Sequence, residues 1–190
     1  MKIFILFLVL IFSLQSFAKA DDVRDFEIEG MSVGDSMLDY ATRSYILDEL
    51  EEAYTYPKSK KYKIIYIKPD NSELYDHINI GIKSKDPKFI IHSINAFVKK
   101  ELDDCLKIKK ETVKSISNIL PNSKKRSYEN DYAKAYGSSI AYVDHFDLEN
   151  GVIRTWCDVW DENLETNWED SLNVAAENSE WINFLDNEAY

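Results

Sequence analysis

The chain has 190 residues, of which 45% are hydrophobic and 13% aromatic, with 5 Gly and 4 Pro. This composition excludes a disordered tail and a collagen-like chain, and it leaves enough apolar side chains for a sizeable core. With 34 acidic against 23 basic residues, the formal net charge is −11, which argues against nucleic acid or an anionic membrane surface as partners.

The first 20 residues have the three parts of a secretory signal peptide. Lys2 supplies a positive start, residues 3–14 form an apolar run, and Ala18-Lys19-Ala20 is a small-x-small cleavage site. The run is too short for a membrane span, although an uncleaved anchor helix is the alternative. We therefore expect a periplasmic or secreted protein. No later segment approaches about 20 apolar residues, so we expect no membrane span after cleavage.

Residues 21–31 are predicted to be a polar lead-in to a single domain over residues 32–190. Ser32 has the features of a helix N-cap, and Asp35 follows three residues later in a variant of the capping box. Apolar residues then recur at helical spacing. The first helix is therefore predicted over residues 33–53.

Three strands are predicted next, over residues 62–68, 75–83 and 89–98, with a turn at residues 69–72. In the second strand, isoleucines alternate with polar or small residues, which predicts one buried and one open face. A central helix follows over residues 100–120, where apolar residues, Cys105 among them, share one stripe.

Residues 122–137 show no clear period, and we expect a surface loop that leads into a weak strand. The strongest local signal comes next. Asn150-Gly151 is a turn dipeptide of type I′, and it lies between two strand-like runs, residues 139–148 and 152–160. A β-hairpin is predicted here.

A two-residue loop at that dipeptide sets the register of the predicted hairpin. Asp147 would lie opposite Arg154, an opposite-charge pair, and Asp144 would lie opposite Cys157. One face of the hairpin is mostly apolar and carries Cys157. The other face mixes aromatic and polar side chains.

A last strand is predicted over residues 170–177, and Ser179 then caps a short helix over residues 180–186. Consecutive strands joined by short turns form antiparallel meanders. The prediction is an α+β fold with an antiparallel sheet or sheets, in the order helix, three strands, helix, three strands, helix.

Two cysteines, Cys105 and Cys157, lie in the predicted mature chain. An even pair in an oxidising compartment usually bonds, so a disulfide between them is predicted. The alternative is two buried free thiols. Neither cysteine has a Cys or His close to it in sequence, so we do not expect a metal site there.

Two stretches resemble a known group of proteins. The run from Glu29 to Tyr40, EGMSVGDSMLDY, and the ending from Phe184 to Tyr190, FLDNEAY, resemble the two ends of small exported proteins from AT-rich, streamlined marine alphaproteobacteria. The cysteine in the central helix also fits that group. The resemblance spans most of the mature chain and is sharpest at its ends. It implies export, and it carries over no activity and no catalytic residue.

Four residues on the outer face of the predicted hairpin are candidate binding residues: His145, Trp156, Asp158 and Trp160. An aromatic floor with polar neighbours can bind a sugar, an organic cation or a peptide. The alternative is that this face packs under a helix or a neighbouring strand.

His92 and Asp144 are candidate catalytic residues, because each is predicted to lie on an apolar strand face. A buried His–Asp pair could serve acid–base chemistry. The alternative is a core histidine whose ring is satisfied by a hydrogen bond. Ser93 is predicted to point to the opposite face from His92, so it offers no nucleophile for the pair.

The sequence contains no Gly-rich phosphate loop, no G-x-S-x-G, no H-E-x-x-H and no C-x-x-C. We expect neither a cofactor nor a metal. The sequence favours a non-enzymatic binding or envelope-interaction domain, whose partner would be an envelope protein, a peptide or a small molecule. The alternative is a small periplasmic hydrolase that uses His92 and Asp144.

Overall fold

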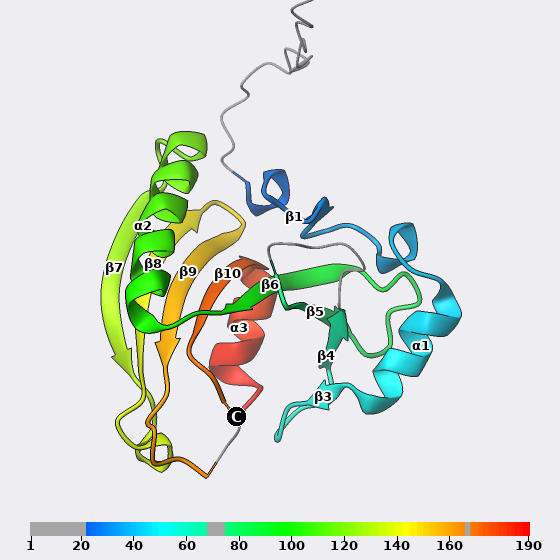
Figure 1. Cartoon of the computed structure of the whole chain (residues 1–190). Helices are drawn as coiled ribbons and strands as arrows, with labels where there is room; N and C mark the ends of the chain where they lie inside the picture. The colour runs from blue at the N-terminus through cyan, green and yellow to red at the C-terminus, as the bar shows by residue number, and fades with distance from the viewer. Residues whose placement is uncertain (1–21, 68–74, 166–167) are drawn as a thin grey trace, which may run out of the picture.

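The computed structural model describes residues 22–67, 75–165 and 168–190 (Figure 1). The predicted signal peptide and the predicted turn at residues 69–72 lie outside the described residues. The described part has an α+β fold, as predicted. Its α-helices are α1 (Arg43–Glu52), α2 (Leu102–Ile119) and α3 (Ser179–Asn187). None of the helices that the structure describes is long and apolar enough to cross a membrane.

The main sheet is antiparallel, and its strands follow the order β3-β4-β5-β6-β10-β9-β8-β7. Two meanders, β3 to β6 and β7 to β10, meet where their last strands pair in the middle of the sheet. The predicted antiparallel meanders are thus confirmed, but each has four strands where three had been predicted, and the additional strands, β3 and β7, are the two edges of the sheet. The strands are β3 (Tyr54–Thr55), β4 (Tyr62–Ile67), β5 (His77–Lys83), β6 (Ile91–Lys99), β7 (Lys124–Asp131), β8 (Ile140–Leu148), β9 (Gly151–Val159) and β10 (Ser171–Asn178).

The first helix is much shorter than predicted. Gly34 has a φ of 98°, which breaks any helix there, and α1 begins only after Thr42, whose hydroxyl caps it. The Asp35 carboxylate does accept a hydrogen bond from the Ser32 amide, at 2.9 Å, but within a turn. The predicted capping hydrogen bond between Ser32 and Asp35 is therefore present, but it closes a turn and not a helix.

β7 occupies residues 124–131, in the segment that was predicted as a surface loop leading into a weak strand. It is the outermost strand of the main sheet, and all of its residues are exposed. An edge strand with both faces in solvent needs no alternation of apolar residues. This explains why its sequence shows no strand period.

The β8–β9 hairpin forms, but in a register two residues away from the predicted one. Leu148 pairs with Gly151, so the turn consists of Glu149 and Asn150. Asp147 lies opposite Val152, and the predicted charge pair across these two strands is absent. A shift by two keeps every side chain on its predicted face, because side chains alternate with period two.

Gly151 explains the error in register. A Cβ atom at this position would lie 2.2 Å from the carbonyl oxygen of Glu177, so the glycine allows close approach of β10. Its place is in the strand, whereas the dipeptide signal had put it in the turn. The same shift places Asp144 opposite Thr155, whereas Cys157 had been predicted there.

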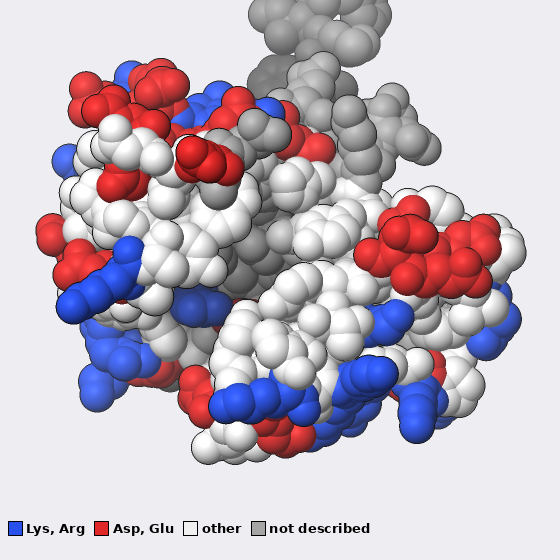
Figure 2. Space-filling view, turned by 90° about the horizontal axis from the view of Figure 1, so that it is seen from below, with Lys and Arg blue, Asp and Glu red and all other residues white. Residues whose placement is uncertain are grey.

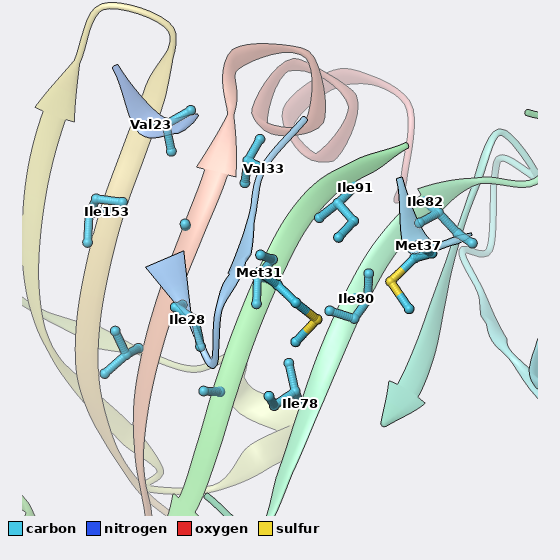
Figure 3. Close-up of a cluster of buried hydrophobic side chains, with 14 of the residues drawn as sticks. Val23, Ile28, Met31, Val33, Met37, Ile78, Ile80, Ile82, Ile91 and Ile153 are labelled. Carbon is cyan, nitrogen blue, oxygen red and sulfur yellow. The ribbon is translucent and has the colours of Figure 1, made fainter. Parts of the chain in front are cut away.

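One face of the sheet, here called the core face, carries the main hydrophobic cluster. Figure 3 shows part of that cluster beside the strands. Helices α1 and α2 contribute to it, and so do Val23, Ile28 and Met31 from the segment predicted to be a polar lead-in. That segment therefore belongs to the folded domain. It forms a small hairpin of β1 (Glu27–Ile28) and β2 (Met31–Ser32).

The predicted disulfide between Cys105 and Cys157 is present, with a Cα–Cα distance of 5.9 Å. It joins α2 to β9 on the core face, and both cysteines are fully buried beside Leu172. The cross-link fixes the crossover helix between the two meanders. It also confirms that Cys105 points inward from its helix.

Candidate functional site

Helix α3 lies on the opposite face of the sheet, here called the α3 face. Its N-cap is Asn178, whose side-chain oxygen accepts a hydrogen bond from the Trp181 amide at 2.8 Å, so the helix begins one residue earlier than predicted. Trp181 and Phe184 are buried against the sheet. The centre of the Phe184 ring lies 4.7 Å from the centre of the Tyr62 ring and 5.0 Å from the centre of the Tyr56 ring. These aromatic contacts anchor the helix.

A cavity of about 170 Å³ lies between α3 and the sheet. Strands β4, β5, β6, β9 and β10 supply its floor and α3 its roof. In the view from below, the surface is hollowed between the left and right halves of the molecule (Figure 2). The cavity walls comprise Tyr56, Ile64, Asn79, Gly81, Ser93, Asn95, Arg154, Trp156, Glu177, Trp181 and Leu185.

Gly81 permits the helix to sit so close to the sheet. A Cβ atom at Gly81 would lie 2.5 Å from two atoms of the Trp181 indole, so any larger residue would displace that ring. Trp181 is 3% exposed, and its indole nitrogen donates to Glu177 at 3.2 Å. The close packing on Gly81 and the hydrogen bond to Glu177 therefore together position Trp181, which forms the roof of the cavity.

A chain of hydrogen bonds crosses the sheet from β6 to Tyr132, the residue after β7. The Asn95 amide donates to the Asn173 oxygen at 3.3 Å, and the Asn173 amide donates to Asp158 at 3.0 Å. Asp158 also accepts from the Trp156 indole at 2.9 Å and from the Tyr132 hydroxyl at 2.6 Å. Burial raises the pKa of Asp158, and these three donors oppose that rise.

The direction of this chain is fixed by the Trp156 indole, which can only donate. The Asp158 oxygen that it contacts must accept, so the amide group of Asn173 points there and its oxygen points to Asn95. Asn95 must then donate to Asn173 with its own amide. Its side-chain oxygen is left over as an acceptor on the cavity side.

An ion pair lies beside this chain. A terminal guanidinium nitrogen of Arg154 lies 2.5 Å from a Glu177 carboxylate oxygen, and the Glu177 side chain is 6% exposed. Burial works to lower the pKa of Arg154, but the Glu177 charge outweighs it and raises that pKa. The guanidinium also lies over the Trp156 ring, 5.3 Å from its centre. The two charges therefore compensate each other.

Four polar atoms of the cavity walls are buried without a hydrogen-bond partner. They are the side-chain oxygens of Asn79 and Asn95, which lie at paired positions on β5 and β6, the Nε atom of Arg154 and the Oε2 atom of Glu177. Of these four atoms, the Glu177 oxygen has an ion-pair partner in Arg154. A buried polar atom without a partner costs free energy, and natural folds rarely keep several together. Two acceptors and one donor from Asn79, Asn95 and Arg154 therefore lie directly behind the cavity surface, where a small shift of the side chains over them would let a ligand pair with them.

The four predicted binding residues share a region but not one site. Trp156 forms part of the cavity wall, and Asp158 lies behind it. His145 lies one strand away beside Arg126 and Asp147, and burial, followed by the Arg126 charge, lowers its pKa.

Trp160 lies outside the cavity, in a separate aromatic cluster. Its ring is 4.8 Å from the ring of Tyr132 and 4.5 Å from that of Trp168. This cluster meets the hydrogen-bonded chain at Tyr132, which donates to Asp158.

The structure does not bring His92 and Asp144 together. Asp144 is bound by Lys109 at 2.8 Å, Ser127 at 2.6 Å and Lys125 at 3.1 Å. Burial alone would raise the pKa of Asp144, but these partners lower it. Strands β10 and β9 separate its strand from that of His92. A catalytic pair therefore has no geometric basis here.

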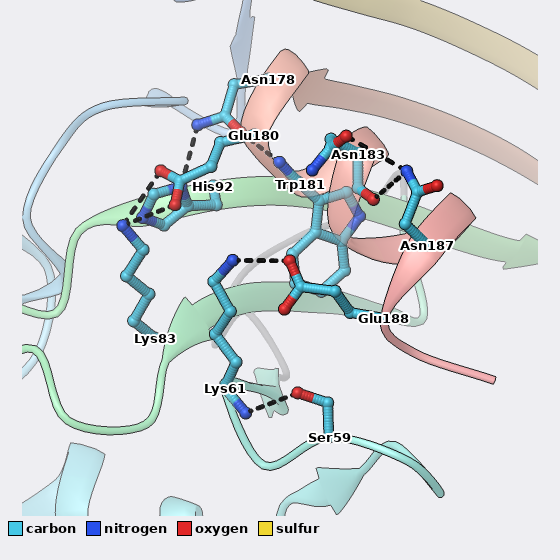
Figure 4. Close-up of polar contacts among 10 residues, drawn as sticks. All are labelled: Ser59, Lys61, Lys83, His92, Asn178, Glu180, Trp181, Asn183, Asn187 and Glu188. Atoms are coloured by element: carbon cyan, nitrogen blue, oxygen red, sulfur yellow. Dashed lines mark hydrogen bonds and ion pairs between the residues drawn. The ribbon is translucent and has the colours of Figure 1, made fainter.

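His92 instead helps to position α3 (Figure 4). It is the extra residue of a bulge in β6, where Ser93 pairs with Gly81 and Ile91 with Ile82. Its ring nitrogen lies 3.0 Å from the Asn178 amide, and burial, followed by the Lys83 charge, lowers its pKa. This matches the core-histidine alternative.

Several residues of the site were not identified from the sequence, namely Asn79, Asn95, Asn173, Arg154, Glu177 and Trp181. A signal was present in part. Asn79 and Gly81 stand on the open face of the alternating second strand, and Asn95 lies between Ile94 and Ala96 in the third strand. Asparagines inside strands are unusual and merit attention as candidate polar wall residues.

A larger cavity, of about 660 Å³, lies near the end of β9. Its walls are charged side chains of both signs, such as Lys99, Glu162 and Glu169, with Trp160 beside them. Charged groups in solvent bind ligands weakly, so size does not favour this cavity. Within the described residues, no group of His, Cys, Asp and Glu is placed to hold a metal ion.

The sequence matches no family model, and comparisons with curated proteins and with solved structures found no match either. Inferences about function therefore rest on the geometry of the cavity beneath α3.

Proposed function

We propose that this protein is an exported, non-enzymatic binding protein that holds a small polar molecule in the cavity beneath α3. The observation that carries the proposal is the set of buried, unpartnered polar atoms of Asn79, Asn95 and Arg154. A ligand that forms hydrogen bonds with these atoms removes the free-energy cost of burying them without partners. The indole rings of Trp156 and Trp181 contribute to the apolar part of the walls, together with Ile64 and Leu185.

Export is part of the proposal. It is supported by the signal-peptide features of residues 1–20, by the resemblance to small exported proteins, and by the use of both cysteines in a disulfide. A binding role needs no catalytic group, and the walls of the cavity include none of the motifs that common hydrolases use.

Native mass spectrometry tests the proposal directly. The mature protein is incubated with the dialysable small molecules of an envelope extract, desalted, and weighed without denaturation. We expect one non-covalent adduct on the wild-type protein. Asn79→Leu should lose the adduct, because it removes one unpartnered acceptor at nearly constant volume.

Asn118→Leu is the matched control, since Asn118 is an exposed residue of α2. It should retain the adduct. An adduct retained equally by Asn79→Leu would place binding elsewhere on the protein. If the wild-type protein retains none, the binding function itself is wrong.

A further inference from the structure

The charges of the cavity indicate a ligand without net charge, if the proposed binding function holds. Arg154 and Glu177 already neutralise each other at 2.5 Å. A charged ligand would leave one charge in this partly buried site without a counterion, and such a charge is costly. A neutral molecule leaves the pair undisturbed.

The unpartnered atoms indicate groups that both donate and accept. The oxygens of Asn79 and Asn95 need donors, and the Nε atom of Arg154 needs an acceptor. The orientation of Asn95 cannot simply reverse, because the Trp156 indole fixes the chain through Asp158 and Asn173. Hydroxyl groups meet both demands, since each donates one hydrogen and accepts through two lone pairs.

The walls and the volume narrow the class further. Trp156 and Trp181 both line the cavity, and indole rings suit contact with the C–H groups of a ring that carries hydroxyls on its edge. A cavity of about 170 Å³ equals the liquid volume of roughly six water molecules. It admits one small ring, and a substituent on that ring would extend through the open side of the cavity.

We infer that the cavity beneath α3 binds a neutral, polyhydroxylated ring compound of monosaccharide size, held by Asn79, Asn95 and Arg154. This inference rests on the proposed function and adds the chemical class of the ligand. Selectivity would come from the balanced Arg154–Glu177 pair, which disfavours both anionic and cationic analogues of the same ring.

Isothermal titration tests the class. The wild-type protein is titrated with neutral rings, namely glucose, galactose, mannose, xylose and myo-inositol. It is also titrated with the anionic counterparts glucuronate and galacturonate and with the cationic counterparts glucosamine and galactosamine. We expect at least one neutral ring to bind, and its charged counterparts to bind at least about 10-fold more weakly, the cost of one uncompensated charge.

Glu177→Gln makes the test sharper. It leaves Arg154 without its counterion while keeping an acceptor for Trp181. The variant should shift the preference toward the uronate by at least about 10-fold relative to wild type. Asn118→Leu should change nothing. Circular dichroism of each variant confirms that the fold is kept.

A charged counterpart that binds the wild-type protein as tightly as the neutral ring would overturn the inference. So would the absence of binding by every neutral ring. In either case an adduct retained from the envelope extract would show that the binding function stands and only the ligand class is wrong. No adduct and no titration signal would remove both.

Discussion

Ile80 and Asn79 are neighbours on β5, and their side chains lie in opposite environments on the two faces of the sheet. Ile80 is fully buried in the main hydrophobic cluster of the core face. The Asn79 oxygen is also buried, on the α3 face, and has no partner. One strand therefore contributes a satisfied side chain to one face and an unsatisfied one to the other.

The two faces also differ in how they are covered. The core face is closed by α1, α2 and the N-terminal hairpin, and a disulfide fixes α2 in place. The α3 face is covered in part by α3, a helix of 9 residues. If the proposed binding function holds, the core face supplies most of the stability, and the α3 face keeps polar atoms without partners for a ligand.

Removal of the disulfide should have the largest effect. Cys105 and Cys157 are separated by 52 residues, and on the chain-entropy model a loop of that length stabilises by about 4 kcal/mol. The double variant Cys105→Ala, Cys157→Ala should lose that much unfolding free energy in guanidinium, and still retain the adduct where it is folded. A loss below about 1 kcal/mol would mean that packing alone holds α2.

Ile80→Ala should cause the second-largest loss of unfolding free energy, and it changes the core face only. Truncation of a fully buried isoleucine removes apolar contact and leaves a cavity, at a cost of about 3 kcal/mol. Urea unfolding measures the loss. The affinity of the cavity for its ligand should stay within about twofold of wild type, since no atom on the α3 face changes. A tenfold loss of affinity would contradict the separation of the two faces.

Gly81→Ala disturbs the other face. The new methyl group would overlap the Trp181 indole, so α3 must move, at a cost of about 1–3 kcal/mol. Binding should be lost as well, because the roof shifts. Trp181→Phe removes the clashing ring atoms, so the double variant should lose less stability than the sum of the two single variants. Strict additivity of the two losses would argue against the predicted overlap.

The faces of the strands were predictable from the sequence, whereas the pairing of residues was less so. Isoleucines at every second position of β5 marked the core face correctly. The hairpin register was wrong, because the glycine of the turn dipeptide serves the packing of Gly151 against β10. Its faces were still right, since the error was an even number of residues.

The cavity itself could not have been predicted, because it needs the docking of α3. The position of that helix depends on the absence of a side chain at Gly81 and on the rings of Tyr56 and Tyr62, far away in the sequence. Trp156 was predicted as a binding residue and lies in the wall. The asparagines of the floor became visible only as partners across strands.

Asn79→Leu should leave stability unchanged or raise it by up to about 1 kcal/mol, because it removes a buried acceptor without a partner. Asn95→Leu is the contrasting variant. It also removes the donor to Asn173, and should cost about 1 kcal/mol. Thermal unfolding compares the two. Destabilisation by Asn79→Leu as large as that by Asn95→Leu would make Asn79 a structural residue.

The smallest expected effect is a pH dependence at the base of α3. Burial, then the Lys83 charge, lowers the pKa of His92 below its unfolded value of about 6.5, while Glu180 and Asp86 oppose that change. The unfolded chain therefore binds a proton first, so unfolding free energy falls as pH decreases below about 6.5. Protonation also removes the ring acceptor that Asn178 uses.

Chemical denaturation between pH 7 and 5.5 measures this slope. His77 and His145 have pKa values lowered mainly by burial, so they contribute in the same direction. His92→Gln keeps an acceptor for Asn178 and cannot titrate, so it should flatten the slope without changing the fold. A slope equal to that of the wild-type protein would assign the pH dependence to the other two histidines. It would also mean that protonation of His92 does not weaken the packing of α3 on the sheet in this pH range.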